Sequence, residues 1–315
     1  MTDDEKAVCS VIICVRNGEA TIGAQLQALA MQFDAPPFEL LVVDNGSTDG
    51  TVDAYERWAM AGTGSVSASR VVHAGEQPGL AFARNQGARQ ASTDILAYCD
   101  ADDVVAPGWV RAIVEAVTLH GSRAVGGTIC ELTPSGKASN AVIMDSLDGV
   151  GPADGADRVY PFFWGCSFAL TREAFMLAGG FDESLPPYGC DDIDIGIRLG
   201  EQAVPISFSP DMQIYYRLPQ GARVRLRRKF RSGVAQACLW ARHPDTYAHA
   251  STLRSIFAVP RELAAVLRAD SSSATRVRRV VELMAKRSGE VWGTLTWVRT
   301  GRLGPAHYFS DGPAA

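Results

Sequence analysis

Three aspartates stand within four positions of the sequence, directly after a short apolar run. The stretch ILAYCDADDVVAPGW, residues 95–109, carries Asp100, Asp102 and Asp103 behind five residues that read as a buried strand. Carboxylates repel one another, and grouping them beside a hydrophobic sheet becomes favourable when they share a divalent cation. Their oxygens are hard ligands that suit Mg²⁺ or Mn²⁺, and Mg²⁺ sites usually recruit substrate phosphates as well. The stretch therefore predicts half of a site for a metal ion and a diphosphate.

An EF-hand loop or a helix cap would account for less of this stretch than a metal–diphosphate site does. An EF-hand loop needs glycine at its sixth position, where this sequence has Val105. Capping of a helix that begins near Pro107 explains Asp103 but does not explain Asp100. Cation binding is therefore the hypothesis for Asp100 and Asp102, and helix capping stays open for Asp103.

A second acidic group lies in GGFDESLPPYGCDDIDIGIRLG, residues 179–200. Asp191 and Asp192 fall at the start of an expected helix, with Ile197 and Arg198 at helical spacing behind them. Aspartates at a helix N-terminus complement the helix dipole by roughly 0.3–1 kcal/mol each, which is a purely structural role. The functional alternative is a general base at the mouth of the same cleft. The spacing leaves both open.

Strands and helices, which must position these acidic groups, are expected to alternate along the first hundred residues. Apolar runs of strand type alternate with segments of helical spacing, which predicts βαβ units and a parallel sheet covered on both faces. Ligands bind such sheets outside the carboxyl ends of the strands, where the polar residues of three predicted strands gather. Strands are expected at 9–15, 38–44, 70–74 and 95–99, and helices at 21–32, 51–61 and 80–91. The polar residues at the strand ends are Arg16, Asn17, Asp44, Asn45, Gly46, Ser47, Asp100, Asp102 and Asp103.

The rest of the chain has a different pattern. Residues from about 120 to 160 are rich in Gly, Pro and Asp, which predicts loops, and 162–171 read as a strand. A short helix follows and is stopped by Gly179 and Gly180. Two or three helices are expected within 224–300. The predicted organisation is an α/β region in two halves, 1–120 and 121–216, followed by a basic, mainly helical extension, 217–315.

Composition indicates an ordinary folded protein. The chain is 47% hydrophobic and 21% charged, and no apolar run reaches the roughly 18 residues that a spanning helix needs. Its first residues are acidic and do not resemble a secretory signal. Cys9, Cys14 and Cys99 fall in apolar strand patterns, as small buried thiols do in a reducing compartment. A cytoplasmic location is expected.

Charge is distributed unevenly along the chain. Residues 1–216 contain 12 Lys and Arg against 29 Asp and Glu, whereas residues 217–315 contain 18 against 6, which together give the net charge of −5. A basic last third predicts a surface for anions, or a solvated arginine-rich helical face. The acidic body and the lack of an RNP-like motif speak against nucleic acid. The run RVRLRRKFR at 223–231 is expected either as a mobile flap over a diphosphate or as a peripheral contact with anionic lipid at the inner membrane face.

Taken together, four stretches resemble the family 2 glycosyltransferases with the GT-A fold. They follow one another in the family's order and approximate spacing over about residues 8–200, and they read VIICVRNGEATI, LLVVDNGSTDGT, GLAFARNQGARQASTDILAYCDADDVV and GGFDESLPPYGCDDIDIGIRL. The resemblance implies an α/β, Rossmann-like, mostly parallel sheet flanked by helices, here with a helical C-terminal extension. It also implies a UDP-, GDP- or dTDP-sugar donor, Mg²⁺ or Mn²⁺, a carbohydrate or lipid-linked acceptor, and transfer with inversion. In such a domain, 1–120 would be the nucleotide-sugar-binding half and 121–216 the acceptor-binding and catalytic half.

The resemblance also implies roles for individual residues of this sequence. Asp102 would ligate the metal, with Asp100 facing the ribose or a metal-bound water, and Asp192 would be the general base, with Asp191 as its alternative. The nucleotide-sugar side would comprise Arg16, Asn17, Asp44, Asn45 and Arg84, and the acceptor side would comprise Trp164, Gly179 and Gly180. An aspartate with an ordinary pKa near 4 is a weak base at neutral pH, so the proton would move late.

Two departures from the family pattern bear on the function. Many relatives carry a metal- or diphosphate-binding histidine after the base-bearing helix, where this sequence has Tyr215 or Tyr216. The family's Glu-Asp pair is Asp191 and Asp192 here. The alternative to an inverting glycosyltransferase is a catalytically silent relative that binds sugar or nucleotide or serves as a scaffold. A metal-dependent rise in melting temperature with nucleotide would show binding, and sugar transfer would separate the two hypotheses.

Overall fold

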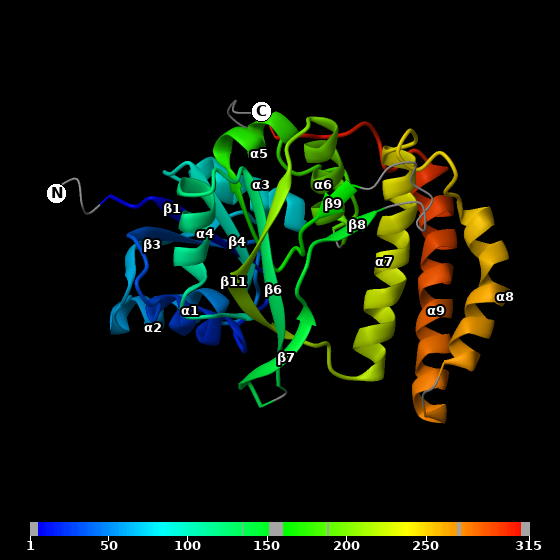
Figure 1. The fold of residues 1–315 in the computed structure, drawn as a ribbon, viewed down its shortest axis with the longest axis horizontal. Coiled ribbons are helices and arrows are strands. Elements are labelled where there is room, and N and C mark those ends of the chain that lie inside the picture. The colour runs from blue at the N-terminus through cyan, green and yellow to red at the C-terminus, as the bar shows by residue number, and fades with distance from the viewer. Residues whose placement is uncertain (1–5, 134, 151–159, 188, 270–271, 310–315) are drawn as a thin grey trace.

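The fold is built on one large mixed sheet (Figure 1). A computed structural model describes residues 6–133, 135–150, 160–187, 189–269 and 272–309. Within these residues the sheet has nine strands in the order β3-β2-β1-β4-β10-β6-β11-β5, and β7 pairs with β6. A separate two-stranded sheet joins β8 and β9. The predicted α/β architecture is confirmed.

The first half of the sheet is parallel, as the alternating pattern predicts. The strands β1 to β4 pair in parallel and are connected by helices α1 to α3 and the loops beside them. Val15 stands opposite Asp44, and Cys14 stands opposite Asp100, so the carboxyl ends of β1, β2 and β4 meet at one edge. The elements are β1 Cys9–Val15, α1 Ile22–Ala30, β2 Phe38–Asp44, α2 Thr51–Ala61, β3 Val66–His73, α3 Leu80–Gln90 and β4 Ile95–Asp100.

The second half of the sheet is largely antiparallel. Strand β10 runs antiparallel to both β4 and β6, while β6 and β11 are parallel and the short β5 is antiparallel to β11. The predicted strand at 162–171 is divided, because β9 ends at Phe162 and β10 begins at Ser167. The remaining elements of this half are β5 Val104–Val105, α4 Trp109–Thr118, β6 Ala124–Leu132, β7 Ala138–Met144, β8 Asp148–Val150, β9 Tyr160–Phe162, β10 Ser167–Thr171, α5 Arg172–Ala178, α6 Asp191–Glu201 and β11 Ile206–Arg217.

The expectation of loops between 120 and 160 is wrong for β6 and β7, and part of that range, 151–159, lies outside the described residues. The prediction of loops rests partly on glycines, which are common in turns. A Cβ at Gly127 would lie 1.9 Å from the carbonyl oxygen of Met212, so this buried strand needs glycine where β11 approaches it. Glycine in a strand can mark such a close approach as well as a turn, and the sequence alone does not separate the two cases.

Hydrophobic side chains fill both faces of the sheet. Val11 and Ile13 point to the face covered by α1, α2 and α4, and Ile12 points to the face covered by α3, α5 and α6. Both clusters consist of fully buried aliphatic and aromatic residues, which accounts for the near-continuous apolar runs of the central strands. The core therefore fixes the strands whose ends carry the polar groups.

The C-terminal region is helical, as predicted. Helices α7, α9 and α8 lie side by side in Figure 1, and α8 is the outermost element, with the other two between it and the sheet. A Cβ at Gly233 would lie 2.0 Å from the Lys286 carbonyl oxygen, and one at Gly289 would lie 2.0 Å from that of Phe230, so the backbones of α7 and α9 touch. Among the described residues, none of the helices combines the length and apolarity needed to cross a bilayer. The elements are α7 Ala222–Arg242, α8 Thr252–Arg268, α9 Ser273–Gly293 and a π-helical turn, η3, Thr294–Val298.

Candidate active site

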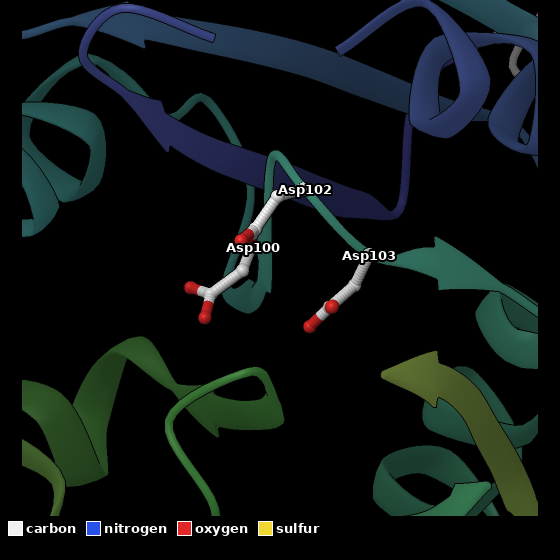
Figure 2. A group of neighbouring side chains, drawn as sticks. All are labelled: Asp100, Asp102 and Asp103. Carbon is white, nitrogen blue, oxygen red and sulfur yellow. The ribbon is translucent and has the colours of Figure 1, made fainter. Parts of the chain in front are cut away.

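The three aspartates after β4 form one cluster. Asp100 is the last residue of β4, and Asp102 and Asp103 lie in the turn that leads into β5. One carboxylate oxygen from each lies within 4.8 Å of the others, and Figure 2 shows the side chains directed toward a common space. Asp103 is buried, Asp100 is partly buried and Asp102 is exposed. The turn thus presents oxygen ligands at the edge of the sheet where bound nucleotides are expected.

Asp103 belongs to this cluster and does not cap a helix. Helix α4 begins at Trp109 with Gly108 as its N-cap and no side-chain cap, so the capping hypothesis for Asp103 is wrong. The Oδ1 atom of Asp103 accepts a hydrogen bond of 2.7 Å from the backbone N–H of Arg217, whereas its buried Oδ2 atom has no hydrogen-bond partner within the described part of the chain. Burial, with the Asp100 and Asp102 charges added to it, raises the pKa of Asp103 to about 9.

The cluster as a whole fits a divalent cation. Burial raises the pKa of Asp100 to about 7; the nearby Arg84 guanidinium opposes this shift, and the Asp102 and Asp191 carboxylates add to it. An unpaired buried oxygen and two raised carboxyl pKa values are the signs of anionic ligands that lack their counter-charge. Carboxylate oxygens are ligands that Mg²⁺ and Mn²⁺ accept, so Asp100, Asp102 and Asp103 suit either ion.

Arg84 connects this cluster to the second acidic group. From the buried face of α3, its Nη1 atom donates to Asp191 Oδ2 at 2.5 Å, and its Nη2 atom donates to the Gly165 carbonyl at 2.5 Å. Asp100 Oδ1 lies 3.7 Å from Nη2. The guanidinium also lies 5.1 Å from the ring centre of Phe168, which shields it from water. Arg84 therefore fixes the positions of carboxylates on both sides of the site.

The structure distinguishes Asp191 from Asp192. Asp191 is buried and engaged by Arg84, whereas Asp192 is partly exposed and accepts backbone hydrogen bonds from Gly165 at 3.0 Å and Ile193 at 2.9 Å. Burial raises the pKa of Asp192 to about 6; the Asp191 charge adds to this, and Arg84 and the two backbone donors oppose it. The assumption of an ordinary pKa near 4 is therefore wrong for Asp192, which becomes a better base near neutral pH.

Four residues expected at the nucleotide lie at the ends of β1 and β2. Arg16 and Asn17 are exposed, and the Asn17 Oδ1 atom accepts a hydrogen bond of 2.8 Å from the Thr48 backbone. The Asp44 carboxylate accepts from the Ser47 N–H at 3.1 Å. Asn45 accepts from the Gly79 N–H at 2.9 Å and donates to two carbonyls of the loop before α3. These contacts order the loops at this edge.

The three residues expected at the acceptor do not lie together. Trp164 packs at the break between β9 and β10, next to Gly165, and its buried indole N–H has no partner among the described residues. Gly179 and Gly180 end α5 on a different part of the surface, where their nearest neighbours include Tyr308 and Phe309 of the C-terminal segment. Trp164 is thus adjacent to Asp192 through Gly165, whereas the carbonyl oxygen of Gly180 accepts a hydrogen bond of 2.7 Å from Arg198.

Basic residues from the C-terminal region complete the surroundings of the cluster. Arg217 donates from Nε to the Asp102 carbonyl at 2.8 Å, and Arg228 lies 5.4 Å from the ring centre of Tyr216. Burial raises the pKa of Asp100 and of Asp103, and the positive charge of Arg228 opposes this with a smaller effect. The basic run 223–231 is the first half of the long helix α7 and not a loop. Sequence reasoning singled out this run but not Arg228 itself.

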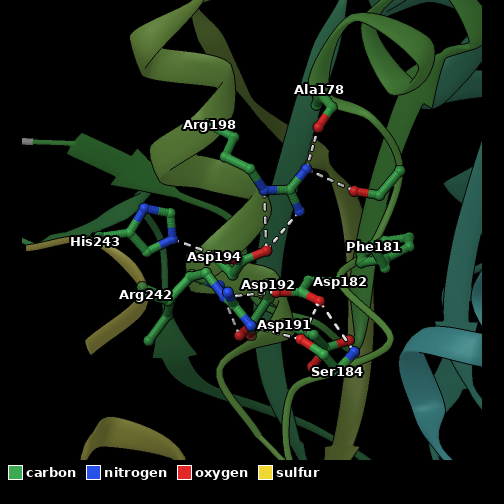
Figure 3. A network of polar contacts seen from close by, with 12 residues as sticks. Ala178, Phe181, Asp182, Ser184, Asp191, Asp192, Asp194, Arg198, Arg242 and His243 are labelled. Carbon is green, nitrogen blue, oxygen red and sulfur yellow. Dashed lines mark hydrogen bonds and ion pairs between the residues drawn. The ribbon is translucent and has the colours of Figure 1, made fainter. Parts of the chain in front are cut away.

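A second buried acidic network was missed by sequence reasoning altogether (Figure 3). Asp194 of α6 accepts from Arg198 Nε at 3.0 Å and lies 2.7 Å from His243 Nε2, while Asp182 lies 2.8 Å from Arg242 Nε. These pairs join α6 and the loop before it to the end of α7. Both carboxylates are fully buried, and both have partners. The i,i+4 spacing of Asp194 and Arg198 is the one signal that the sequence contained.

The chain matches the family model described as glycosyl transferase family 2 over residues 10–175. Residues 153–220 match a second model, described as the N-terminal domain of galactosyltransferase. The first match contains the aspartate cluster and Arg84, and the second contains the Asp191–Asp192 pair.

Several curated relatives are glycosyltransferases. Validoxylamine A glucosyltransferase of Streptomyces hygroscopicus subsp. limoneus is 26% identical over 233 residues, which are 64% of this chain and 49% of the relative. Glycosyltransferase AglE of Haloferax volcanii is 34% identical over 128 residues, 40% of this chain and 41% of the relative. The chain spans about half the length of the first of these and of a second Streptomyces relative.

Solved structures share the fold. A mannosyltransferase from Pyrobaculum calidifontis, in complex with GDP-Man and Mn²⁺, superposes with a TM-score of 0.62 at 22% identity and covers 92% of this chain and 89% of its own. GalNAc-T7 with UDP, GalNAc and Mn²⁺ gives a TM-score of 0.58 at 16% identity, over 94% of this chain and 57% of its own.

Proposed function

Because this chain belongs to glycosyl transferase family 2, we propose that it moves a sugar from a nucleoside diphosphate to an acceptor hydroxyl with inversion at the anomeric carbon. One observation carries the proposal. A cluster of carboxylates suited to a cation lies on one side of the buried Arg84, which contacts Asp100, and Asp191 is held on the other side. Asp192, next to Asp191 in the chain, has a pKa raised to about 6, which suits a general base. The acceptor class is a carbohydrate or a lipid-linked sugar.

The donor side is formed by the ends of β1, β2 and β4. Arg16, Asn17, Asp44 and Asn45 would line the nucleotide pocket, because they share the edge at which Asp100 ends its strand. The cluster would hold Mg²⁺ or Mn²⁺ through Asp102, with Asp100 and Asp103 beside it. When bound, the cation offsets negative charge on the diphosphate, an effect of several kcal/mol in such reactions.

Charge that develops on the leaving diphosphate also has partners in the chain itself. Arg228 projects from α7 toward the cluster, and its electrostatic effect on Asp100 and Asp103 supports a position close enough to act there. Arg84 is fully engaged with Asp191 and Gly165, so its role is to position the carboxylates. Tyr216, one of the two tyrosines expected at the position of the family's histidine, stands under Arg228.

The acceptor side is formed around Asp192. Its carboxylate would take the proton of the acceptor hydroxyl while the hydroxyl oxygen attacks the anomeric carbon, and the nucleoside diphosphate would leave with the bonding electrons. A base with a pKa near 6 is mostly ionised at neutral pH and still able to accept a proton. Trp164, next to Gly165, would provide an apolar wall for the acceptor. Gly179 and Gly180 have only an indirect part, through the C-terminal segment.

The proposal is tested by measuring nucleoside diphosphate release from UDP-, GDP- and dTDP-sugars with Mn²⁺, with Mg²⁺ and with EDTA. Transfer should require a divalent cation, and Asp102→Asn should abolish the metal-dependent rise in melting temperature that the donor nucleotide causes. Asp94→Asn is the matched control, because Asp94 is exposed at the opposite end of the same strand. Unchanged metal and nucleotide binding by Asp102→Asn would refute the site, and binding without transfer would favour a catalytically silent relative.

A further inference from the structure

Helix α8 exposes an apolar face that no other described element covers. Leu253, Phe257 and Leu267 are 68%, 81% and 58% exposed, and Ile256 is exposed as well. These side chains recur every three or four residues, with Pro260 and Ala264 between them, and therefore lie on one side of the helix. The opposite side carries Ser255, the one residue of α8 that is buried, which faces α9 through a hydrogen bond to Glu290.

A row of arginines borders this apolar face. Arg254, Arg261 and Arg268 recur at intervals of seven residues, which places them along one edge of the helix. Arg254 and Arg261 are exposed, and in the part of the chain that the structure describes no carboxylate lies within ion-pair distance of either. Arg254 donates from Nη1 to the His249 carbonyl at 2.9 Å. The edge is therefore positively charged.

Beside the arginine row lies a polar cavity between α7, α8 and α9. It has a volume of about 490 Å³, and Arg254, Arg261 and Lys286 line it together with Glu262 and Glu290. The two glutamates are held by Arg287, whose Nε donates to Glu262 at 3.2 Å and whose Nη1 donates to Glu290 at 2.7 Å. Arg287 offsets one of these two negative charges, and with Arg254, Arg261 and Lys286 the cations of the lining outnumber its carboxylates, so the cavity suits an anion.

We propose that α8 binds the surface of an anionic phospholipid bilayer. Its apolar side chains would enter the boundary between headgroups and acyl chains, while Arg254 and Arg261 would contact headgroup phosphates at the cavity. An amphipathic helix with arginines beside a strip of Leu, Ile and Phe has the composition that binds in this plane. The contact thus lies on α8 and not on the run 223–231, whose Arg228 faces the aspartate cluster.

Charge favours lipid over a second copy of this chain. A symmetric contact between two α8 helices would bring the arginine row of one copy near that of the other, and like charges at an interface cost binding energy. Phosphates of an anionic bilayer would instead complement the same row. The inference does not depend on the proposed transfer reaction, because lipid binding needs neither nucleotide nor metal.

The test is flotation of the full chain with vesicles of phosphatidylcholine, with and without phosphatidylglycerol. The protein should float with the anionic vesicles, and added salt should weaken the binding. The double variant Leu253→Ser and Phe257→Ser should lower the partition coefficient about 100-fold. Arg254→Ala with Arg261→Ala should lower it about 30-fold.

Matched controls lie on the opposite part of the molecule. Phe33→Ser removes another largely exposed aromatic side chain, from the region of α1, and Arg57→Ala removes an exposed charge from α2, so both should bind as the unaltered protein does. Circular dichroism and melting temperature should be the same for all variants, because every changed residue is exposed. Failure of the unaltered protein to float with anionic vesicles, or equal flotation of the α8 variants, would overturn the proposal. A dimer that only the α8 variants convert to a monomer would assign the face to a second copy.

Discussion

Two groups of buried aspartates lie on neighbouring elements, and their surroundings are opposite. Asp182 and Asp194 are engaged by arginines and a histidine (Figure 3), and the pKa of Asp194 is lowered, because Arg198 and His243 outweigh the effect of burial. Asp103 is equally buried, but one of its oxygens has no partner, and burial raises its pKa to about 9. Burial alone therefore does not distinguish structural from functional carboxylates.

The difference lies in whether the chain itself supplies the counter-charge. A paired buried carboxylate needs nothing more, and it ties elements together. An unpaired one destabilises the free protein and is relieved when a cation binds, so a group of them marks a site. The Asp182–Asp194 network fixes α6 against α7, and α6 in turn carries Asp191 and Asp192 at its first turn.

The largest effect is expected from Asp192→Asn. If Asp192 is the base, the variant should retain binding of metal and donor nucleotide but lose about 10²–10⁴-fold in kcat, which steady-state transfer assays would measure. Asp191→Asn is the companion variant, because it removes the partner of Arg84 without removing the base. A larger loss of kcat in Asp191→Asn than in Asp192→Asn would assign the base to Asp191 instead.

Next in size is the effect of Asp194→Ala on stability. Removing one partner of a buried ion pair leaves Arg198 without its counter-charge, so the free energy of unfolding should fall by about 3–5 kcal/mol in urea titrations. Asp94→Ala, at an exposed position, should change it by no more than about 0.5 kcal/mol. An unchanged urea midpoint for Asp194→Ala would remove the structural role assigned to this network.

A smaller effect is expected from pH. Since the pKa of Asp192 is raised to about 6 and the base acts in its ionised form, kcat/KM should fall about tenfold for each pH unit below 6. The measurement should use saturating Mn²⁺, because protons also compete with the metal at the cluster. The acid limb should disappear from the residual activity of Asp192→Asn; an identical limb in that variant would mean that another group titrates.

The smallest effect is expected from Asp103→Asn in the metal-free protein. Asp103 has a folded pKa near 9 and an ordinary value near 4 when unfolded, so its contribution to stability is present below pH 4 and is lost as pH rises toward 9. Asparagine keeps an acceptor for the Arg217 N–H and carries no charge. The variant should therefore melt a few degrees higher than the unaltered protein at pH 8, with the difference vanishing near pH 4, and Mn²⁺ should stabilise it less. A lower melting temperature at pH 8 would contradict the assignment.

The sequence predicts the first half of the fold well, because local pattern and tertiary role agree there. The apolar runs at 9–15 and 38–44 coincide with β1 and β2, and their polar ends meet at one edge as parallel pairing requires. The same reasoning fails for β6, where Gly126 and Gly127 are needed by neighbouring chain and not by a turn. The sequence pattern identifies a glycine but does not show whether another segment of the chain packs closely against it. That depends on the tertiary structure.

The candidate site is predictable to the extent that its residues are adjacent in sequence. Asp100, Asp102 and Asp192 stand in recognisable stretches, whereas Arg228 reaches the cluster from a helix more than a hundred residues away. Its position beside the cluster, and the ion pair between Arg84 and Asp191, depend on tertiary contacts that periodicity does not encode. The pKa of Asp192 belongs to the same class of property, because burial by distant segments determines it.

The glycine contact between α7 and α9 has a mechanical consequence. Since no side chain separates the two backbones at Gly233 and Gly289, these helices have no room to slide or rotate independently, and α9 also carries α8. A displacement of α8 would therefore be transmitted through α9 to α7. Arg228 lies in the first half of α7, beside the aspartate cluster. An alanine at Gly233 would place its Cβ 2.0 Å from the Lys286 carbonyl oxygen, so α7 and α9 would have to move apart to accept even this small side chain.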